Sequence, residues 1–187
     1  MTKKLTFAFL ALALTVACGE DWRRGTFQLY GAAGGNAMAG TAEDTKPSFG
    51  LGFAAGMGRY VAVTGSYAWN RLASMDNSGC LEGVCLRVQA RAVAHELLGG
   101  LRLNAPKPSR AIPYLALGGG LVRARASGSA PGIAFSTTKA RPAFAIGGRV
   151  DIGVGGPVAV IFDFRAVKAS EVRAYARASA GIGFRFR

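Results

Sequence analysis

Residues 172–187, VRAYARASAGIGFRFR, alternate between apolar and polar side chains almost without interruption. Successive side chains of a β-strand point to opposite faces, so this pattern predicts one long strand whose two faces meet different media. The apolar face ends in Ile182, Phe184 and Phe186, and the other face carries arginine, serine and glycine. An amphipathic strand of this length, with aromatic residues at its end, is typical of a membrane-spanning β-barrel.

The N-terminal residues have the features of a secretory signal. Lys3 and Lys4 precede an apolar run over residues 5–17, which ends in small residues before Cys18. We therefore predict a signal peptide at residues 1–17 and a periplasmic N-terminal segment at 18–25. The thirteen residues of the run are fewer than the ~20 that a spanning helix needs, and no later run is longer. A closed barrel is the other structure that satisfies its backbone in lipid.

The three cysteines predict one small disulfide and one remaining thiol. Cys80 and Cys85 enclose only residues 81–84 and lie in a polar stretch, so an oxidising compartment favours a bond between them. Cys18 is then left over. It is either a lipidated N-terminal cysteine or a residue that is removed or unmodified.

Eight segments with period-two alternation follow the predicted signal. We expect strands at residues 26–33, 48–57, 61–70, 87–103, 112–126, 141–154, 158–167 and 172–187. The apolar set of the fourth segment changes face near His95 and Glu96, which predicts a β-bulge there. Short turns alternate with longer loops at 34–47, 72–86 and 127–138, where recognition would reside. The prediction is an all-β fold, an eight-stranded antiparallel up-and-down transmembrane β-barrel over residues 26–187, with a soluble β-sandwich as the alternative.

The end of the chain also carries a family resemblance. Residues 180–186, AGIGFRF, resemble the C-terminal insertion signal of the eight-stranded outer-membrane β-barrel family, which includes the OmpA-like transmembrane domains. In that family the aromatic residue normally comes last, whereas here Arg187 follows it. The resemblance extends over residues 26–186. It implies residence in the bacterial outer membrane and recognition of the last strand by the barrel assembly machinery.

Charged residues on the inward faces are expected to pair, because eight strands enclose an interior that side chains fill. The residues predicted to form these pairs are Arg91, Glu96, Arg149, Asp151, Asp163 and Arg177. The short turn at 155–157 places Arg149 opposite Asp163, with Arg177 near the same carboxylate, while Glu96 is expected to serve Arg91 or Arg102. The alternative is a narrow path lined by surplus arginine, which would make the protein a small channel for apolar or anionic solutes.

The formal net charge of +13 is the strongest indication of a partner. Basic residues that map to the outer end of the barrel, and could bind the phosphates of lipopolysaccharide, are Arg71, Arg123, Arg125, Lys139, Arg141, Arg165, Lys168 and Arg173. The alternative is that these side chains only solvate the ends of the strands. No nucleic-acid-binding motif accompanies the basic composition, so nucleic acid is not an expected partner.

Catalysis is not expected from this sequence. His95 is the single histidine, and Ser66 on the preceding strand is the one candidate nucleophile that could approach it. No third residue completes a triad, and there is no phosphate loop or metal-ligand spacing. We therefore expect His95 to lie at a bulge or in the interior, and no cofactor or metal. The predicted role is that of a monomeric structural or surface-interaction protein, with lipid A modification as a further alternative.

Overall fold

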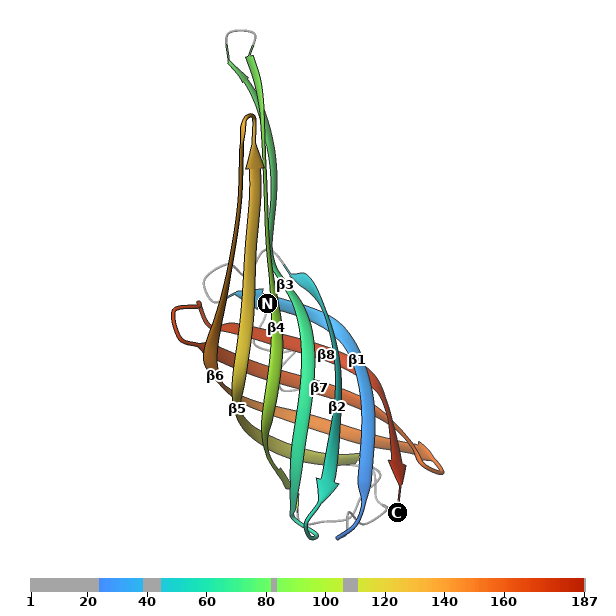
Figure 1. Cartoon of the computed structure of the whole chain (residues 1–187). Coiled ribbons are helices and arrows are strands. Elements are labelled where there is room, and N and C mark those ends of the chain that lie inside the picture. The colour runs from blue at the N-terminus through green and yellow to red at the C-terminus, as the bar shows by residue number, and fades with distance from the viewer. Residues whose placement is uncertain (1–23, 39–44, 82–83, 106–110, 187) are drawn as a thin grey trace, which may run out of the picture.

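The chain forms one closed antiparallel barrel of eight strands (Figure 1). The computed structural model describes residues 24–38, 45–81, 84–105 and 111–186. Each strand pairs with its neighbours in sequence, and β8 returns to pair with β1. The predicted fold class is therefore confirmed. The strands are β1 (Phe27–Met38), β2 (Lys46–Gly56), β3 (Val61–Leu81), β4 (Val84–Asn104), β5 (Ala111–Ala130), β6 (Ile133–Gly155), β7 (Val158–Ala169) and β8 (Tyr175–Phe186).

The alternating C-terminal stretch is the strand that closes the barrel. Its register with β1 runs from Phe27 opposite Phe186 to Met38 opposite Tyr175. The aromatic residues of its apolar face point outward and are about half exposed, whereas Tyr175 and Arg177 on the other face are buried. The two faces therefore have the environments that the alternation predicted, although the strand begins at Tyr175 and not at residue 172.

Large apolar side chains cover the outside of the barrel on all sides. They include Leu29, Leu51, Phe53, Leu101, Leu115, Leu117, Phe144, Ile146, Phe162, Phe164, Ile182 and Phe184, all at least 40% exposed. Such a continuous apolar belt is stable against lipid and unfavourable in water, so the arrangement excludes the soluble β-sandwich. Within the described residues, no helix has the length and apolar character required for a membrane span.

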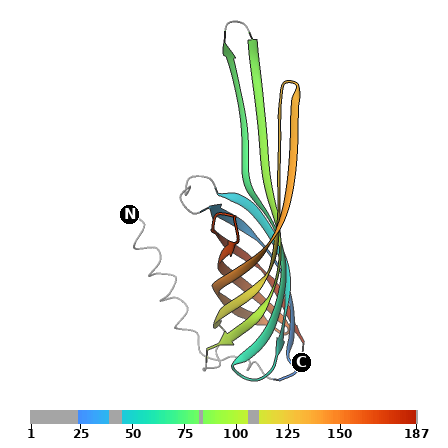
Figure 2. The same cartoon turned by 60° about the vertical axis from the view of Figure 1, so that its left-hand side comes forward.

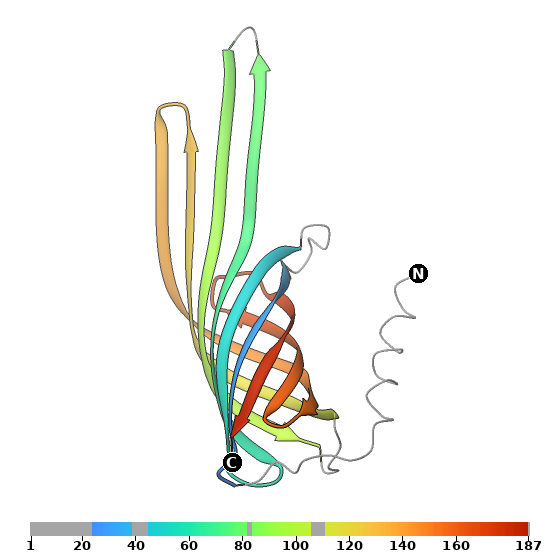
Figure 3. The same ribbon diagram turned by 90° about the vertical axis from the view of Figure 1, so that its right-hand side faces the viewer.

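Two hairpins continue far beyond the barrel, at the end opposite to the end of β8 (Figures 1, 2 and 3). We call residues 73–81 and 84–92 the β3–β4 arm and residues 125–138 the β5–β6 arm, because strand pairing continues along each hairpin there. The expected loops at 72–86 and 127–138 are therefore largely strand, which corrects the sequence interpretation. Cross-strand pairing continues along each arm, and residues 89–92 of one arm also pair with residues 126–129 of the other.

In the β3–β4 pair the β-bulge lies on β3 and not on β4. The register of β4 is continuous through His95 and Glu96 against both neighbours, whereas on β3 it shifts between Arg71 and Ala73. Leu72 is the extra residue, and it is buried in an apolar cluster inside the barrel. The predicted bulge at His95 was wrong because the apolar residues of the upper part of β4 face inward together with Glu96.

Candidate functional site

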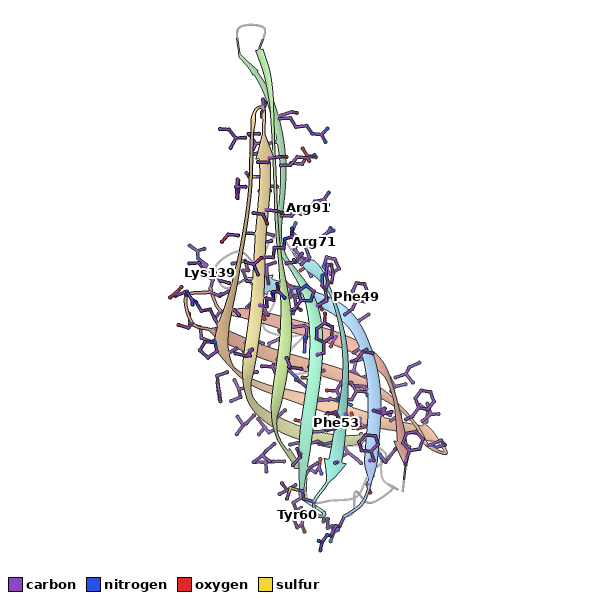
Figure 4. All side chains as sticks on the ribbon, in the orientation of Figure 1. Phe49, Phe53, Tyr60, Arg71, Arg91 and Lys139 are labelled. Carbon is purple, nitrogen blue, oxygen red and sulfur yellow. The ribbon has the colours of Figure 1, made fainter. Side chains whose placement is uncertain are left out.

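Four arginines lie together on the outward face of β3, β4 and β5. We call Arg71, Arg91, Arg123 and Arg125 the outer basic patch. Arg71 on β3 and Arg125 on β5 both lie opposite Val93 of the strand between them, and Arg123 lies opposite His95. Neighbouring strands are ~4.8 Å apart, so these guanidinium groups can converge on one ligand. Figure 4 shows Arg71 and Arg91 where the arms leave the barrel.

Asp76, a carboxylate that attracts Arg91, is bound by side chains outside the patch. Asp76 accepts hydrogen bonds from Arg87 Nη2 at 2.7 Å and from Gln89 Nε2 at 3.1 Å. The Arg87 hydrogen bond is the main cause that lowers the pKa of Asp76, to which Arg91 adds a weaker charge attraction. No salt bridge within the described residues involves a patch arginine.

Aromatic side chains lie directly below the patch on the outward face. The rings of Phe49 and Trp69 stack with their centroids 5.8 Å apart, and Tyr67 Oη lies 2.7 Å from His95 Nδ1. Aromatic girdles of this kind mark the interface between lipid chains and headgroups in transmembrane barrels. In Figure 4, Phe49 lies below Arg71 and Arg91, with Phe53 further down. The patch is therefore at headgroup level.

The other predicted rim residues have different environments. Arg141 Nη2 donates to Glu171 Oε2 at 2.5 Å, and Lys139 Nζ lies 3.8 Å from the same atom. The Arg141 hydrogen bond is the largest cause of the lowered pKa of Glu171. Lys168 and Arg173 are exposed, and Lys168 Nζ donates to a backbone carbonyl.

Arg165 was placed on the rim by the sequence analysis, and this placement was wrong. The side chain is inside the barrel and its residue is 7% exposed, because it shares the inward face of β7 with Asp163. Arg165 Nε lies 3.1 Å from Asp163 Oδ1, and its Nη1 donates to Ser66 Oγ at 2.9 Å. Arg165 therefore belongs to the interior network.

Two of the interior ion pairs among the described residues lie along one strand, and two join different strands. Arg149 lies opposite Asp163 in register, as expected, but its Nε donates to Asp151 Oδ1 at 2.8 Å. Asp151 also pairs with Arg102, whose Nη1 lies 3.1 Å from Oδ2. Pairs between residues i and i+2 on one face are possible because the arginine side chain spans two residues of a strand.

Glu96 pairs with a residue that the sequence analysis assigned elsewhere. It is 1% exposed and accepts hydrogen bonds from Asn70 Nδ2, from Tyr175 Oη at 2.7 Å and from Arg177 Nη1 at 3.3 Å. Arg177 was expected near Asp163, and Arg91 or Arg102 was expected to serve Glu96. Arg91 cannot do so, because a continuous β4 places it on the opposite face.

Stacked guanidinium groups complete the interior and were not predicted. Arg102 Cζ lies 3.5 Å from the ring centroid of Tyr114, and Arg149 Cζ lies 3.8 Å from that of Tyr30. Such cation–π contacts stabilise desolvated arginines. Alternation could have indicated that these tyrosines face inward, but not which arginine each of them meets.

The interior is filled. An apolar cluster contains Leu72, Leu98, Val122 and Val167, together with Tyr175, whose hydroxyl donates to Glu96. A void lined by Tyr30, Ser66 and Arg165, among others, measures about 10 Å³, which is room for about one water molecule. At these levels the described side chains leave no space for a solute.

The remaining predicted residues do not form a reactive site. His95 faces outward beside Tyr67, whereas Ser66 faces inward to Arg165, so the two cannot act together and the expected interior or bulge position of His95 was wrong. The part of the chain described here holds no metal-binding group of three His, Cys, Asp or Glu residues. The backbones of Cys80 and Cys85 lie opposite each other. Their side chains, Cys18 and residues 1–17 are outside the described part, so the disulfide, the lipidation and the signal peptide stay predictions.

A closed eight-stranded barrel with an apolar outer belt and a filled polar interior defines an integral outer-membrane β-barrel protein. No family model and no curated protein matches the sequence. Solved structures do match. Ail of Yersinia pestis, in complex with the heparin analogue sucrose octasulfate, is similar at a TM-score of 0.60 and 16% identity over 87% of this chain and 99% of Ail.

Two further outer-membrane proteins share the fold. A major outer membrane protein of Thermus thermophilus has a TM-score of 0.61 at 9% identity, over 86% of this chain and 98% of its own. Neisserial surface protein A has a TM-score of 0.53 at 14% identity, over 86% of this chain and 96% of its own. At these identities the likeness is one of fold. It agrees with the outer-membrane location that the belt and the closed barrel indicate.

Proposed function

We propose that this protein is a surface-interaction barrel that binds the phosphate groups of lipopolysaccharide through the outer basic patch. The observation that carries the proposal is the position of Arg71, Arg91, Arg123 and Arg125. They lie on one outward face, at headgroup level, without a carboxylate partner among the described residues. Arginine binds phosphate oxygens in a bidentate manner, which suits the phosphorylated sugars of the outer leaflet.

Two features support this proposal over the alternatives. The filled interior and its apolar cluster argue against a solute channel. The opposite orientations of His95 and Ser66 argue against lipid A modification.

The protein would act as a monomer, enter the membrane through the assembly machinery that reads β8, and present its arms outside the cell. The polysulfated sugar in the Ail complex suggests a soluble polyanion as a second probe of the patch.

Lipid retention tests the proposal. The full chain is reconstituted in phosphatidylcholine vesicles that contain lipid A with or without its phosphates, and bound lipid is measured by mass spectrometry after mild extraction. Replacing the four patch arginines by glutamine should lower the affinity at least ~100-fold, since each basic residue near an anionic surface contributes ~1 kcal/mol. Wild-type protein should also lose binding as the salt concentration rises.

A matched control removes the same charge elsewhere. Arg24, Arg59, Lys168 and Arg173 are exposed and lie outside the patch. Their replacement by glutamine should leave retention close to that of the wild type. If both quadruple variants lose lipid A retention equally, net charge and not the patch attracts the lipid. If the wild type retains phosphorylated and dephosphorylated lipid A equally, the proposal is overturned.

A further inference from the structure

An apolar groove crosses the outer wall of the barrel below the outer basic patch. It has a volume of about 560 Å³ and extends over β8, β1, β2, β3 and β4. Its lining includes Leu29, Gly31, Gly65, Leu97 and Phe184, and its polar outward member is Tyr67. This volume is within the range of ~300–1,000 Å³ that is usual for small-molecule sites.

A glycine on the outward face of β1 contributes to the recess of the groove. A Cβ atom at Gly31 would meet Leu51 Cδ2 at 3.4 Å, so the space beside it is open enough for an added side chain. At Gly65 the ring of Phe53 lies over the position that a Cβ would occupy. The wall is therefore recessed at β1, while the rings and branched side chains of the neighbouring strands form the sides.

The upper end of the groove meets the polar residues of the patch. Tyr67 lines the groove, and its hydroxyl lies 2.7 Å from His95 Nδ1. Arg123 lies opposite His95, and Arg71 is four residues beyond Tyr67 on the same strand, a rise of ~13 Å. Positive charge thus lies at one end of an apolar groove, with an aromatic interface between them. This is the polarity of a lipid with an anionic headgroup.

We propose that the groove holds one acyl chain of the phosphorylated lipid A whose phosphates bind the patch. The inference rests on the proposed function and adds a second determinant to it. The surrounding lipid is as apolar as the groove. An acyl chain that enters the groove therefore gains packing contacts but no hydrophobic transfer free energy. The arginines provide most of the affinity, and the groove fixes the lipid beside β1–β4.

The test fills the groove without changing its charge. Gly31→Leu adds a side chain inside it, and Leu97→Trp enlarges an outward residue that is 63% exposed. Gly119→Leu is the matched control, because Gly119 is on the outward face of β5, outside the groove, where a Cβ would meet only Ala143 O at 3.7 Å. Folding of each variant is verified by its heat-modifiable mobility on a gel.

Two measurements separate the groove from the patch. Lipid A retention in vesicles should fall about threefold in Gly31→Leu and Leu97→Trp relative to Gly119→Leu, the scale of a few lost packing contacts. Binding of water-soluble sucrose octasulfate, measured by calorimetry, should be unchanged in all three variants. The double variant Arg71→Gln/Arg123→Gln should bind both ligands at least ~10-fold more weakly.

Each outcome has a distinct meaning. Unchanged lipid A retention in both filled variants overturns the groove inference and leaves the proposed function intact. Undiminished binding of both ligands by the arginine double variant overturns the proposed function itself. A dimer in sedimentation experiments that Gly31→Leu dissociates would show that a second copy of the chain occupies the groove, and would also overturn the inference.

Discussion

Replacing Glu96 by leucine should destabilise the barrel far more than the loss of an exposed ion pair. The Glu96 carboxylate is buried and accepts hydrogen bonds from Asn70, Tyr175 and Arg177. The substitution leaves the Arg177 guanidinium buried without its carboxylate, which costs ~3–5 kcal/mol in folding free energy. Glu171→Leu removes an exposed carboxylate that binds Arg141, so the unfolding free energy should stay close to that of the wild type.

The double variant Glu96→Leu/Arg177→Met gives the decisive comparison. It replaces both charges by apolar side chains next to an apolar cluster that already contains Leu98 and Val167. Only the donors of Asn70 and Tyr175 then lack their acceptor, and a buried unsatisfied donor costs ~1–3 kcal/mol. The double variant should therefore be more stable than Glu96→Leu alone, although it carries one more substitution.

Urea unfolding in lipid vesicles, followed by tryptophan fluorescence and by the heat-modifiable gel band, measures these free energies. A coupling of at least ~2 kcal/mol between the two sites is expected from a double-mutant cycle. Additive losses, or a Glu96→Leu variant as stable as Glu171→Leu, would refute the argument that a desolvated Arg177 depends on this carboxylate.

Three other outcomes are expected. Vesicles that contain the wild-type protein should not become permeable to small sugars or anions, because the interior void holds about one water molecule; a steady anion conductance in planar bilayers would contradict the filled interior. In a Cys18→Ser background, Cys80 and Cys85 should resist maleimide until reduced, and a reaction in oxidised protein would exclude their bond. The pKa of Glu171, followed by NMR, should lie below its usual value and should rise in Arg141→Gln. Because folding lowers this pKa, the Glu171–Arg141 contact stabilises the protein fully at pH values above the pKa of Glu171 in the unfolded chain. The stabilisation is lost as the pH falls through the pKa of Glu171 in the folded protein.

Period-two alternation made much of the fold predictable. On β6, β7 and β8 the phenylalanines face outward, whereas Arg149, Asp163 and Arg177 face inward, so the sequence pattern predicts the two faces of these strands. Arg149 lies opposite Asp163 as predicted, although a register shift between Gly153 and Gly155 places Gly155 opposite Val158 at the turn. The ion pairs could not follow from register alone, because a long arginine side chain reaches carboxylates on its own strand as well as across it.

The alternation failed where the interior is itself apolar. Ala94 and Leu98 face inward beside Glu96, so β4 shows no contrast between its faces at this level, and a bulge was inferred there. The arms were missed for a related reason. Many of their residues are serine, glycine and alanine, so the sequence resembles loops, whereas the structure pairs these residues as antiparallel strands.

Two groups of arginines in this barrel differ in what surrounds them. Inside, Arg102, Arg149 and Arg165 each contact a carboxylate, so their positions follow from folding. Outside, Arg71 and Arg123 lie on one face with like charges nearby and no salt bridge among the described residues. Clustered like charges on neighbouring strands reduce stability. When like charges cluster in this way and no contact within the fold compensates them, we expect a ligand to supply the compensating contact. The arrangement of charge therefore directs the search for function to the outer wall and away from the interior.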